Sequence, residues 1–255
     1  MLSATDSARG SGTASSRAAT RALVVRDLDV HYGKVQALRG IGLRIEPGEM
    51  VALLGSNGAG KTSTLRAISG LVAPSGGTID FGDVAVGGLA AHEVVGYGIA
   101  HLPEGRELFP TLTVEENLRF GYYSRRRDGD YDERLTEVFG IFPRLGERRK
   151  QAAGTLSGGE QQMLGAARSL MSKPELLMID ELSLGLAPMI VADLFAILRD
   201  VNDAGTSVLI VEQFIHLALK NTHRAYVLAK GEVVLEGSSS ELGSDPQVVE
   251  AYLGG

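Results

Sequence analysis

Residues 50–62 read MVALLGSNGAGKT and carry the strongest structural signal in the chain. The first five of these residues are apolar, which is typical of a short buried strand. They pass into Gly55-Ser56-Asn57-Gly58-Ala59-Gly60-Lys61-Thr62, which fits the pattern G-x-x-x-x-G-K-[ST]. A helical pattern follows over residues 61–68, so the motif has the preceding strand and following helix that a phosphate-binding loop requires.

Each residue type in this motif has a physical reason. Glycines let the backbone wrap with its N–H groups facing inward, which forms an anion nest at a helix N-terminus. Lys61 is expected to place its ammonium on the β- and γ-phosphates, and the hydroxyl of Thr62 to bind Mg²⁺. The alternative is a glycine turn with a purely structural role. The predicted nucleotide-binding residues are Gly55, Ser56, Asn57, Gly58, Ala59, Gly60, Lys61, Thr62 and Ser63.

Length and composition exclude several classes of protein. The chain has 255 residues, enough for one large domain or two small ones with a sizeable core. It contains no cysteine, so disulfide frameworks and cysteine-metal sites are impossible. A formal net charge of −6 argues against a nucleic-acid-binding protein. No uninterrupted apolar run approaches the roughly 18–20 residues of a bilayer span, so we do not expect the chain to cross a membrane itself.

The chain divides into a tail and one α/β domain. Residues 1–20 are rich in Ser, Ala and Thr, and are predicted to be a disordered tail. Strand and helix patterns alternate over residues 21–255, which indicates a largely parallel sheet. The expected strands are 22–30, 36–45, 50–54, 78–81, 176–179 and 207–211, with a final hairpin of 225–228 and 233–235. The expected helical parts are 61–68, about 113–170, and 189–201.

A second buried strand ends in two carboxylates. Residues 176–179 (LLMI) are followed at once by Asp180 and Glu181. At the carboxyl end of a strand in an α/β sheet, such side chains face the ligand crevice. With the phosphate-binding motif upstream, the pair predicts that Asp180 holds Mg²⁺ through its water shell and that Glu181 polarises the attacking water.

A second glycine motif lies before this acidic pair. Leu156-Ser157-Gly158-Gly159-Glu160 puts a serine and two glycines at a predicted helix start, where N–H donors and the helix dipole can bind phosphate. Ser157 can equally be a simple N-cap, with Glu160 closing a capping box. The two interpretations are compatible.

With these motifs in this order, the chain resembles the ATP-binding subunits of ABC transporters over about residues 22–255. GSNGAGKT looks like their Walker A motif, LLMIDE like Walker B and LSGGEQQ like the signature motif. The resemblance implies an α/β P-loop NTPase with a RecA-like core, an antiparallel β subdomain and an inserted helical subdomain at about residues 103–170. It also implies a head-to-tail dimer with two sandwiched ATP molecules. In that dimer the residues acting on the partner's ATP would be Leu156, Ser157, Gly158, Gly159 and Glu160.

Three further positions match the family or depart from it. Tyr32 falls where an aromatic ring stacks on adenine, and an ordinary strand-end tyrosine is the alternative. Glu104 stands where the family has the Q-loop glutamine, and Gln213 where it has the switch histidine. Gln213 can donate a neutral hydrogen bond to the γ-phosphate but cannot titrate, whereas Glu104 can accept from water or approach Mg²⁺. The expected catalytic residues are Glu181, Gln213 and Glu104.

Other segments narrow the subfamily and its partners. PEGRELFPTLTVEENL, SLGLAP and AYLGG resemble the F-type subunit of branched-chain amino acid importers, and importers of urea or short amides share much of this pattern. The resemblance implies ATP and Mg²⁺ as cofactors, and a peripheral place on the cytoplasmic face of the inner membrane. The implied partners are a second ATP-binding subunit, two membrane permease subunits and, indirectly, an external solute-binding protein. Two alternatives stay open, namely a soluble ABC ATPase acting on nucleic acid or ribosomes, and a nucleotide-binding regulator that seldom turns over.

Phe109, Pro110 and Leu112 are apolar residues in a loop setting after Glu104. We expect them to line a groove that receives a helix of a membrane subunit, and packing into the core is the alternative.

Overall fold

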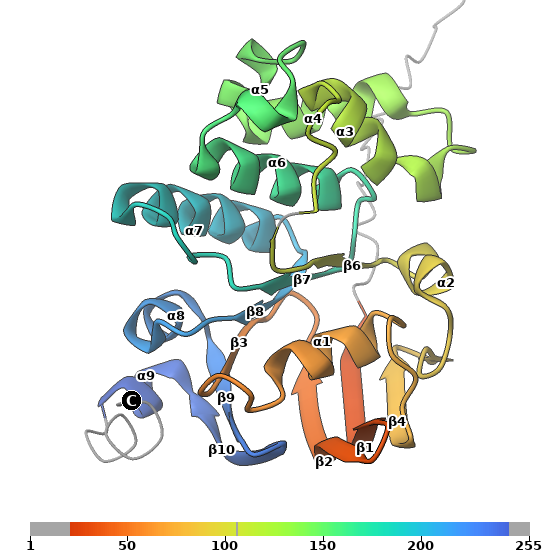
Figure 1. Ribbon diagram of the computed structural model, residues 1–255, viewed down its shortest axis with the longest axis vertical. Coiled ribbons are helices and arrows are strands. Elements are labelled where there is room, and N and C mark those ends of the chain that lie inside the picture. The colour runs from red at the N-terminus through yellow and green to blue at the C-terminus, as the bar shows by residue number, and fades with distance from the viewer. Residues whose placement is uncertain (1–20, 106, 245–255) are drawn as a thin grey trace, which may run out of the picture.

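A six-stranded sheet runs through the centre of the structure, a computed structural model that describes residues 21–105 and 107–244 (Figure 1). Its strands, in spatial order, are β10 (Glu232–Ser238), β9 (Arg224–Ala229), β3 (Met50–Leu54), β8 (Ser207–Val211), β7 (Leu176–Asp180) and β6 (Ile99–Leu102). Five of them run parallel, and β10 pairs antiparallel with β9 at one edge. The predicted tail 1–20, Arg106 and the AYLGG end lie outside the described residues.

The central strands have continuous apolar sequences because both faces of the sheet are covered. All five residues of β3, of β7 and of β8 are buried. Along β7, Leu176 and Met178 join the core on one side of the sheet, whereas Leu177 and Ile179 join the core on the other side. A strand buried on both faces has no polar positions to alternate with, which explains the uninterrupted runs in the sequence.

A second sheet is antiparallel and covers one side of the molecule together with helix α1 (Lys61–Ile68) (Figure 1). Its strands, in spatial order, are β2 (Val35–Ile45), β1 (Leu23–Tyr32), β4 (Gly76–Phe81) and β5 (Val84–Ala85). Leu28 and Ile79 of this sheet share one apolar core with Val51 and Leu53 of β3. The predicted combination of an α/β core and an antiparallel β subdomain is therefore confirmed.

Several helices lie between β6 and β7 in the sequence and gather at one end of the molecule, the upper part of Figure 1. They are α3 (Val114–Gly121), η1 (Tyr123–Arg125), α4 (Tyr131–Ile141), α5 (Pro143–Glu147), η2 (Ala153–Thr155) and α6 (Gly158–Leu170). A Cβ on Gly121 would lie 2.0 Å from the carbonyl oxygen of Arg168. Glycine at this position therefore lets α3 cross α6 at close range.

The remaining helices cover the sheet and its edges. They are α2 (Ala91–Gly96), α7 (Pro188–Asp203), α8 (Ile215–Asn221) and α9 (Ser239–Ser244). Helices α8 and α9 pack on β3 and β9 through a small apolar cluster that includes Ala52, Leu54, Ala218 and Leu219. Within the described ranges, no helix combines the length and the apolar character needed to cross a membrane.

The sequence patterns located most elements and missed several short ones. The predicted bounds of β3, α1 and β8 agree with the structure, and the helix predicted at 189–201 extends over Pro188–Asp203. Proline fits at position 188 because the first N–H groups of a helix have no partner within the helix, so the N–H that proline lacks is not needed there. The missed elements include β5, α2, β6 and α9, each of six residues or fewer. Such short segments contain too few residues to reveal a period.

His101 in β6 should make stability depend on pH. Its Nδ1 lies 3.2 Å from the hydroxyl of Ser69, and its Nε2 has no hydrogen-bond partner among the described residues. Burial lowers the pKa of His101 to about 4, and the charge of Arg66 acts in the same direction. Because the unfolded chain then binds the proton more readily, the free energy of unfolding should fall as pH drops from about 6.5 toward 4, by on the order of 3 kcal/mol.

Urea unfolding at a series of pH values tests this expectation. His101→Gln should lose the part of the pH dependence that lies between 6.5 and 4, and parallel curves for the two proteins would contradict the assignment.

Candidate active site

A cavity of about 850 Å³ opens where β3 passes into α1. Many of the residues predicted to bind or hydrolyse a nucleotide line it, although they are far apart in the sequence. They are Asn57, Gly58, Gly60, Lys61, Thr62, Ser63, Glu104, Glu181 and Gln213. The parallel sheet explains this convergence, since the segments that follow β3, β6, β7 and β8 all leave from the carboxyl ends of parallel strands.

The glycine loop before α1 wraps tightly around a lysine. Gly55, Gly58 and Gly60 all have positive φ, at +146°, +78° and +111°. The ammonium of Lys61 donates to the carbonyl oxygens of Gly55 (2.7 Å) and Ser56 (3.1 Å). Lys61 is buried, and this burial lowers its pKa, whereas two nearby carboxylates raise it. Backbone carbonyl groups of the loop therefore hold the ammonium of Lys61 in place.

The N-terminus of α1 is open toward this loop. Its N-cap residue is Gly60, which has no side chain to accept from the first N–H groups, and the first turn contains no acidic residue. The first four N–H groups of a helix have no partner within the helix. Together with the helix dipole they form a site for an anion such as a phosphate group.

Asp180 is a buried carboxylate at the end of β7. It is 1% exposed, and neither of its carboxylate oxygens has a hydrogen-bond partner among the described residues. Burial raises its pKa, and the carboxylates of Glu181 and Glu104 act in the same direction. The hydroxyl of Thr62 lowers the pKa of Asp180 from nearby without reaching hydrogen-bond geometry. A buried carboxylate without donors is costly unless a cation balances it.

This arrangement fits Mg²⁺ rather than a metal held by protein alone. Mg²⁺ keeps several water molecules and is usually bound by one or two carboxylates and by substrate phosphates. The described residues contain no group of three or more His, Cys, Asp or Glu that could hold a metal ion. Thr62 and Asp180 offer one hydroxyl and one carboxylate, and this small ligand set fits a metal that arrives with a nucleotide.

Glu181 and Gln213 form a pair at the ends of neighbouring strands. The amide of Gln213 donates to Oε1 of Glu181 at 2.5 Å. The backbone of Glu181 lies in the left-handed region, with φ +52°, and its N–H donates to the carbonyl of Val211 at 3.0 Å. Glu104, which follows β6, is exposed and lines the same cavity. The predicted catalytic residues thus share one cavity.

The signature residues lie elsewhere, at the start of α6. Ser157 is the N-cap of this helix, and its N–H and hydroxyl donate to Glu160 at 2.9 and 2.8 Å, while the N–H of Glu160 donates back at 3.3 Å. The predicted capping box is therefore confirmed. Leu156 is buried, Ser157 and Gly158 are exposed, and a Cβ on Gly159 would lie 2.7 Å from Ile190. The cavity at Lys61 is lined by none of the five signature residues.

The rim of the cavity contains residues that the sequence did not predict. Tyr32 is 42% exposed at the end of β1 and is not among the lining residues, whereas Val35, its partner across the hairpin, is. Arg39 and Lys230 line the rim as well, and Arg39 donates to the carbonyl of Lys230 at 3.3 Å. No motif in the sequence marks these two residues, because only the packing of β2 against the β9–β10 turn brings them to the site.

Known proteins give a clear family for this chain. The model of the ABC transporter family matches residues 38–183. The chain is 44% identical to the high-affinity branched-chain amino acid transport ATP-binding protein BraG of Pseudomonas aeruginosa, over 89% of this chain and 97% of that protein. It is 34% identical to the probable branched-chain amino acid transport ATP-binding protein LivF of Archaeoglobus fulgidus, over 84% of this chain and 91% of that protein.

Solved structures agree with this result. The ADP conformation of MJ1267, an ATP-binding cassette of an ABC transporter, matches with a TM-score of 0.81 and 26% identity, over 92% of this chain and 99% of that chain. The chain belongs to the ABC transporter family, as one of its ATP-binding proteins of the ATP-hydrolysing class. The family and the fold class that the sequence predicted are therefore confirmed.

Two glycines of the phosphate loop should respond differently to alanine. A Cβ on Gly55 would lie 2.3 Å from the carbonyl oxygen of Leu228, whereas a Cβ on Gly58 would meet nothing within 4 Å. Gly58→Ala should lower the free energy of unfolding by roughly 1–2 kcal/mol for the left-handed backbone alone. Gly55→Ala should lose about 1–3 kcal/mol more through overpacking.

Urea unfolding measures this difference, and binding of a fluorescent ATP analogue reports the loop. We expect Gly55→Ala to lose more nucleotide affinity than Gly58→Ala, and equal losses of stability would contradict the steric argument.

Proposed function

We propose that this chain is the ATP-hydrolysing subunit of an ABC importer of branched-chain amino acids. The main support for this proposal is the similarity of the chain to BraG, which extends over nearly the whole of both chains. The cavity at Lys61 supports it, because phosphate-binding, metal-binding and water-aligning groups meet there. We place the chain, as a peripheral subunit, at the cytoplasmic face of the inner membrane.

In this proposal, different residues of the site bind the phosphates, hold the metal ion and align the attacking water. Lys61 and the backbone N–H groups of residues 56–62 bind the phosphates, and Thr62 with Asp180 holds Mg²⁺. Bound there, Mg²⁺ neutralises charge that develops on the phosphate oxygens. Glu181 orients and polarises the attacking water, and Gln213 holds the Glu181 carboxylate in place.

Hydrolysis in this proposal needs a second ATP-binding subunit. The signature residues lie at the start of α6, outside the cavity that holds Lys61. Ser157 and Gly158 are exposed, so they can reach ATP bound by a partner in a head-to-tail dimer. The first N–H groups of α6, such as that of Gly158, and the helix dipole supply positive potential for the γ-phosphate of that ATP. Tyr32 is proposed to stack on adenine at the rim beside Val35.

A second cavity, of about 660 Å³, is the proposed contact with a membrane subunit. It lies beside the helices between β6 and β7, which we propose as the helical subdomain of about residues 103–170. Phe109 and Phe120 are 43% and 53% exposed, and their ring centroids are 4.6 Å apart. Half-exposed aromatic rings at a cavity mouth suit the apolar face of a helix.

Glu181→Gln tests the assigned chemistry. The amide keeps the size of the side chain but cannot accept a proton, so hydrolysis should fall by roughly 10²–10⁴ while ATP affinity stays near that of the wild type. The measurement is phosphate release by the purified transporter complex, together with ATP binding by fluorescence. Near-normal turnover would contradict the role of Glu181.

The cargo is tested in the same complex, with its own solute-binding protein. Leucine, isoleucine and valine should stimulate ATP hydrolysis, and urea and short amides should not. Stimulation by urea alone would assign the chain to the other class of importer, and hydrolysis stimulated only by nucleic acid would remove the transport function.

Phe109→Asp tests the contact with the membrane subunit. A charge there should prevent co-purification with the membrane subunits while the thermal stability of the isolated chain stays unchanged. Val234→Asp, at an apolar residue of similar exposure on β10, is the matched control and should assemble normally. Normal assembly of Phe109→Asp would remove this surface from the interface.

A further inference from the structure

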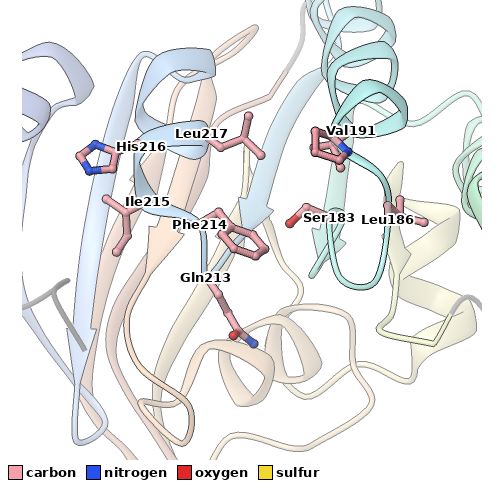
Figure 2. Close-up of a pocket in the computed structure, with 9 residues that line it drawn as sticks. Ser183, Leu186, Val191, Gln213, Phe214, Ile215, His216 and Leu217 are labelled. Carbon is pink, nitrogen blue, oxygen red and sulfur yellow. The ribbon is translucent and has the colours of Figure 1, made fainter.

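Two segments face each other beyond the ends of β7 and β8. Residues 181–187 follow β7 and residues 212–217 follow β8, and both line a cavity of about 510 Å³. Figure 2 shows Ser183 and Phe214 on opposite walls of this cavity, with Gln213 at one end. Glu181 and Gln213, the proposed catalytic pair, therefore stand at the start of the two segments.

Glu212 connects these segments from below the surface. It is 1% exposed, and its carboxylate accepts from the N–H of Ser183 at 3.0 Å and from the hydroxyl of Ser183 at 2.6 Å. It makes no ion pair with any of the residues that the structure describes. Burial raises the pKa of Glu212, whereas the hydrogen bonds from Ser183 lower it. The carboxylate is therefore satisfied by the loop after Glu181.

The backbone of Glu181 needs such support. A non-glycine residue in the left-handed region costs about 1–2 kcal/mol, and the conformation persists only where surrounding contacts impose it. The contact on the near side is the hydrogen bond from the N–H of Glu181 to Val211. The contact on the far side is the pair of hydrogen bonds between Ser183 and Glu212. Residues 211–213 thus hold the chain on both sides of Glu181.

We propose that Glu212 is a positioning residue for ATP hydrolysis, acting through Ser183 on Glu181. By fixing the backbone two residues after Glu181, it keeps the Glu181 carboxylate within reach of Gln213 and of the attacking water. This inference rests on the proposed function, in which Glu181 aligns that water. A displacement of about 1 Å at a reacting group can cost about 10²-fold in rate, so a remote hydrogen bond can matter this much.

A purely structural role makes a different prediction. A buried carboxylate that only satisfies a loop would, when removed, lower stability without a selective effect on the chemical step. A positioning residue lowers kcat and leaves ATP affinity intact, because it acts on the group that aligns the water. It also has no further effect once Glu181 itself is removed, since residues that act as a unit are not additive.

The experiment compares Glu212→Ala, Ser183→Ala and Glu212→Gln in the full-length chain assembled with its transporter partners. Glu212→Ala should lower kcat about 10–100-fold with ATP affinity unchanged, and Ser183→Ala, which keeps the N–H donor, should lower it less. Glu212→Gln should retain most activity, because its oxygen accepts from the N–H of Ser183 and its amide donates to the hydroxyl. In a Glu181→Gln background, Glu212→Ala should cause no further loss of residual turnover.

Asn202→Ala is the matched control. Asn202 is also buried, and its side chain donates to the carbonyls of Gly48 and Thr206 at 2.9 and 2.8 Å, away from the catalytic cavity. It should lower the melting temperature without changing kcat. Unchanged kcat in Glu212→Ala beside an active wild type would overturn the positioning role, as would equal losses in the Gln and Ala variants. If Glu212→Ala does not fold, unchanged kcat in Ser183→Ala overturns it. An inactive wild type would instead overturn the proposed function.

Discussion

The parallel pairing of the strands from β6 to β9 is the constraint on which the site depends. Parallel strands end at the same edge of a sheet, so every segment that leaves a carboxyl end begins there. The glycine loop, the acidic pair and the residues after β8 therefore meet in space, although they are far apart in the sequence. Both faces of these strands are covered by apolar cores, which makes the edge the place where polar groups can gather.

Charge decides what this edge can bind. The carboxylates of Asp180 and Glu181 act on the ammonium of Lys61, and Glu104 lines the same cavity, which has Arg39 and Lys230 at its rim. A nucleoside triphosphate adds further negative charge, so its phosphates need positive potential beyond that of Lys61. The open N-terminus of α1 provides part of it, and in our proposal a divalent cation held by Thr62 and Asp180 would provide the rest. The open helix N-terminus and the proposed metal site would thus act together to balance the charge of the phosphates.

The chain also presents surfaces that are complete only with partners. The signature loop is held by its own capping box and by close packing of Gly159 on Ile190, and none of its residues lines the cavity at Lys61. The apolar mouth around Phe109 lies on another part of the surface. We therefore propose that nucleotide binding, dimer contact and membrane contact lie on separate elements, which the central sheet connects. In the proposed mechanism, Glu212 and Ser183 connect the segments after β7 and β8.

The family, the phosphate loop, the acidic pair and the positions of the main strands along the chain could all be predicted from the residues alone. These features are local, since a glycine turn, an N-cap or a buried strand depends on neighbours within a few residues. The sequence did not reveal β6, the rim residues Arg39 and Lys230, or the burial of Glu212 against Ser183. These features depend on the tertiary structure. They arise where strands that are distant in the sequence pair with each other, and where burial changes the partners that a polar group can find.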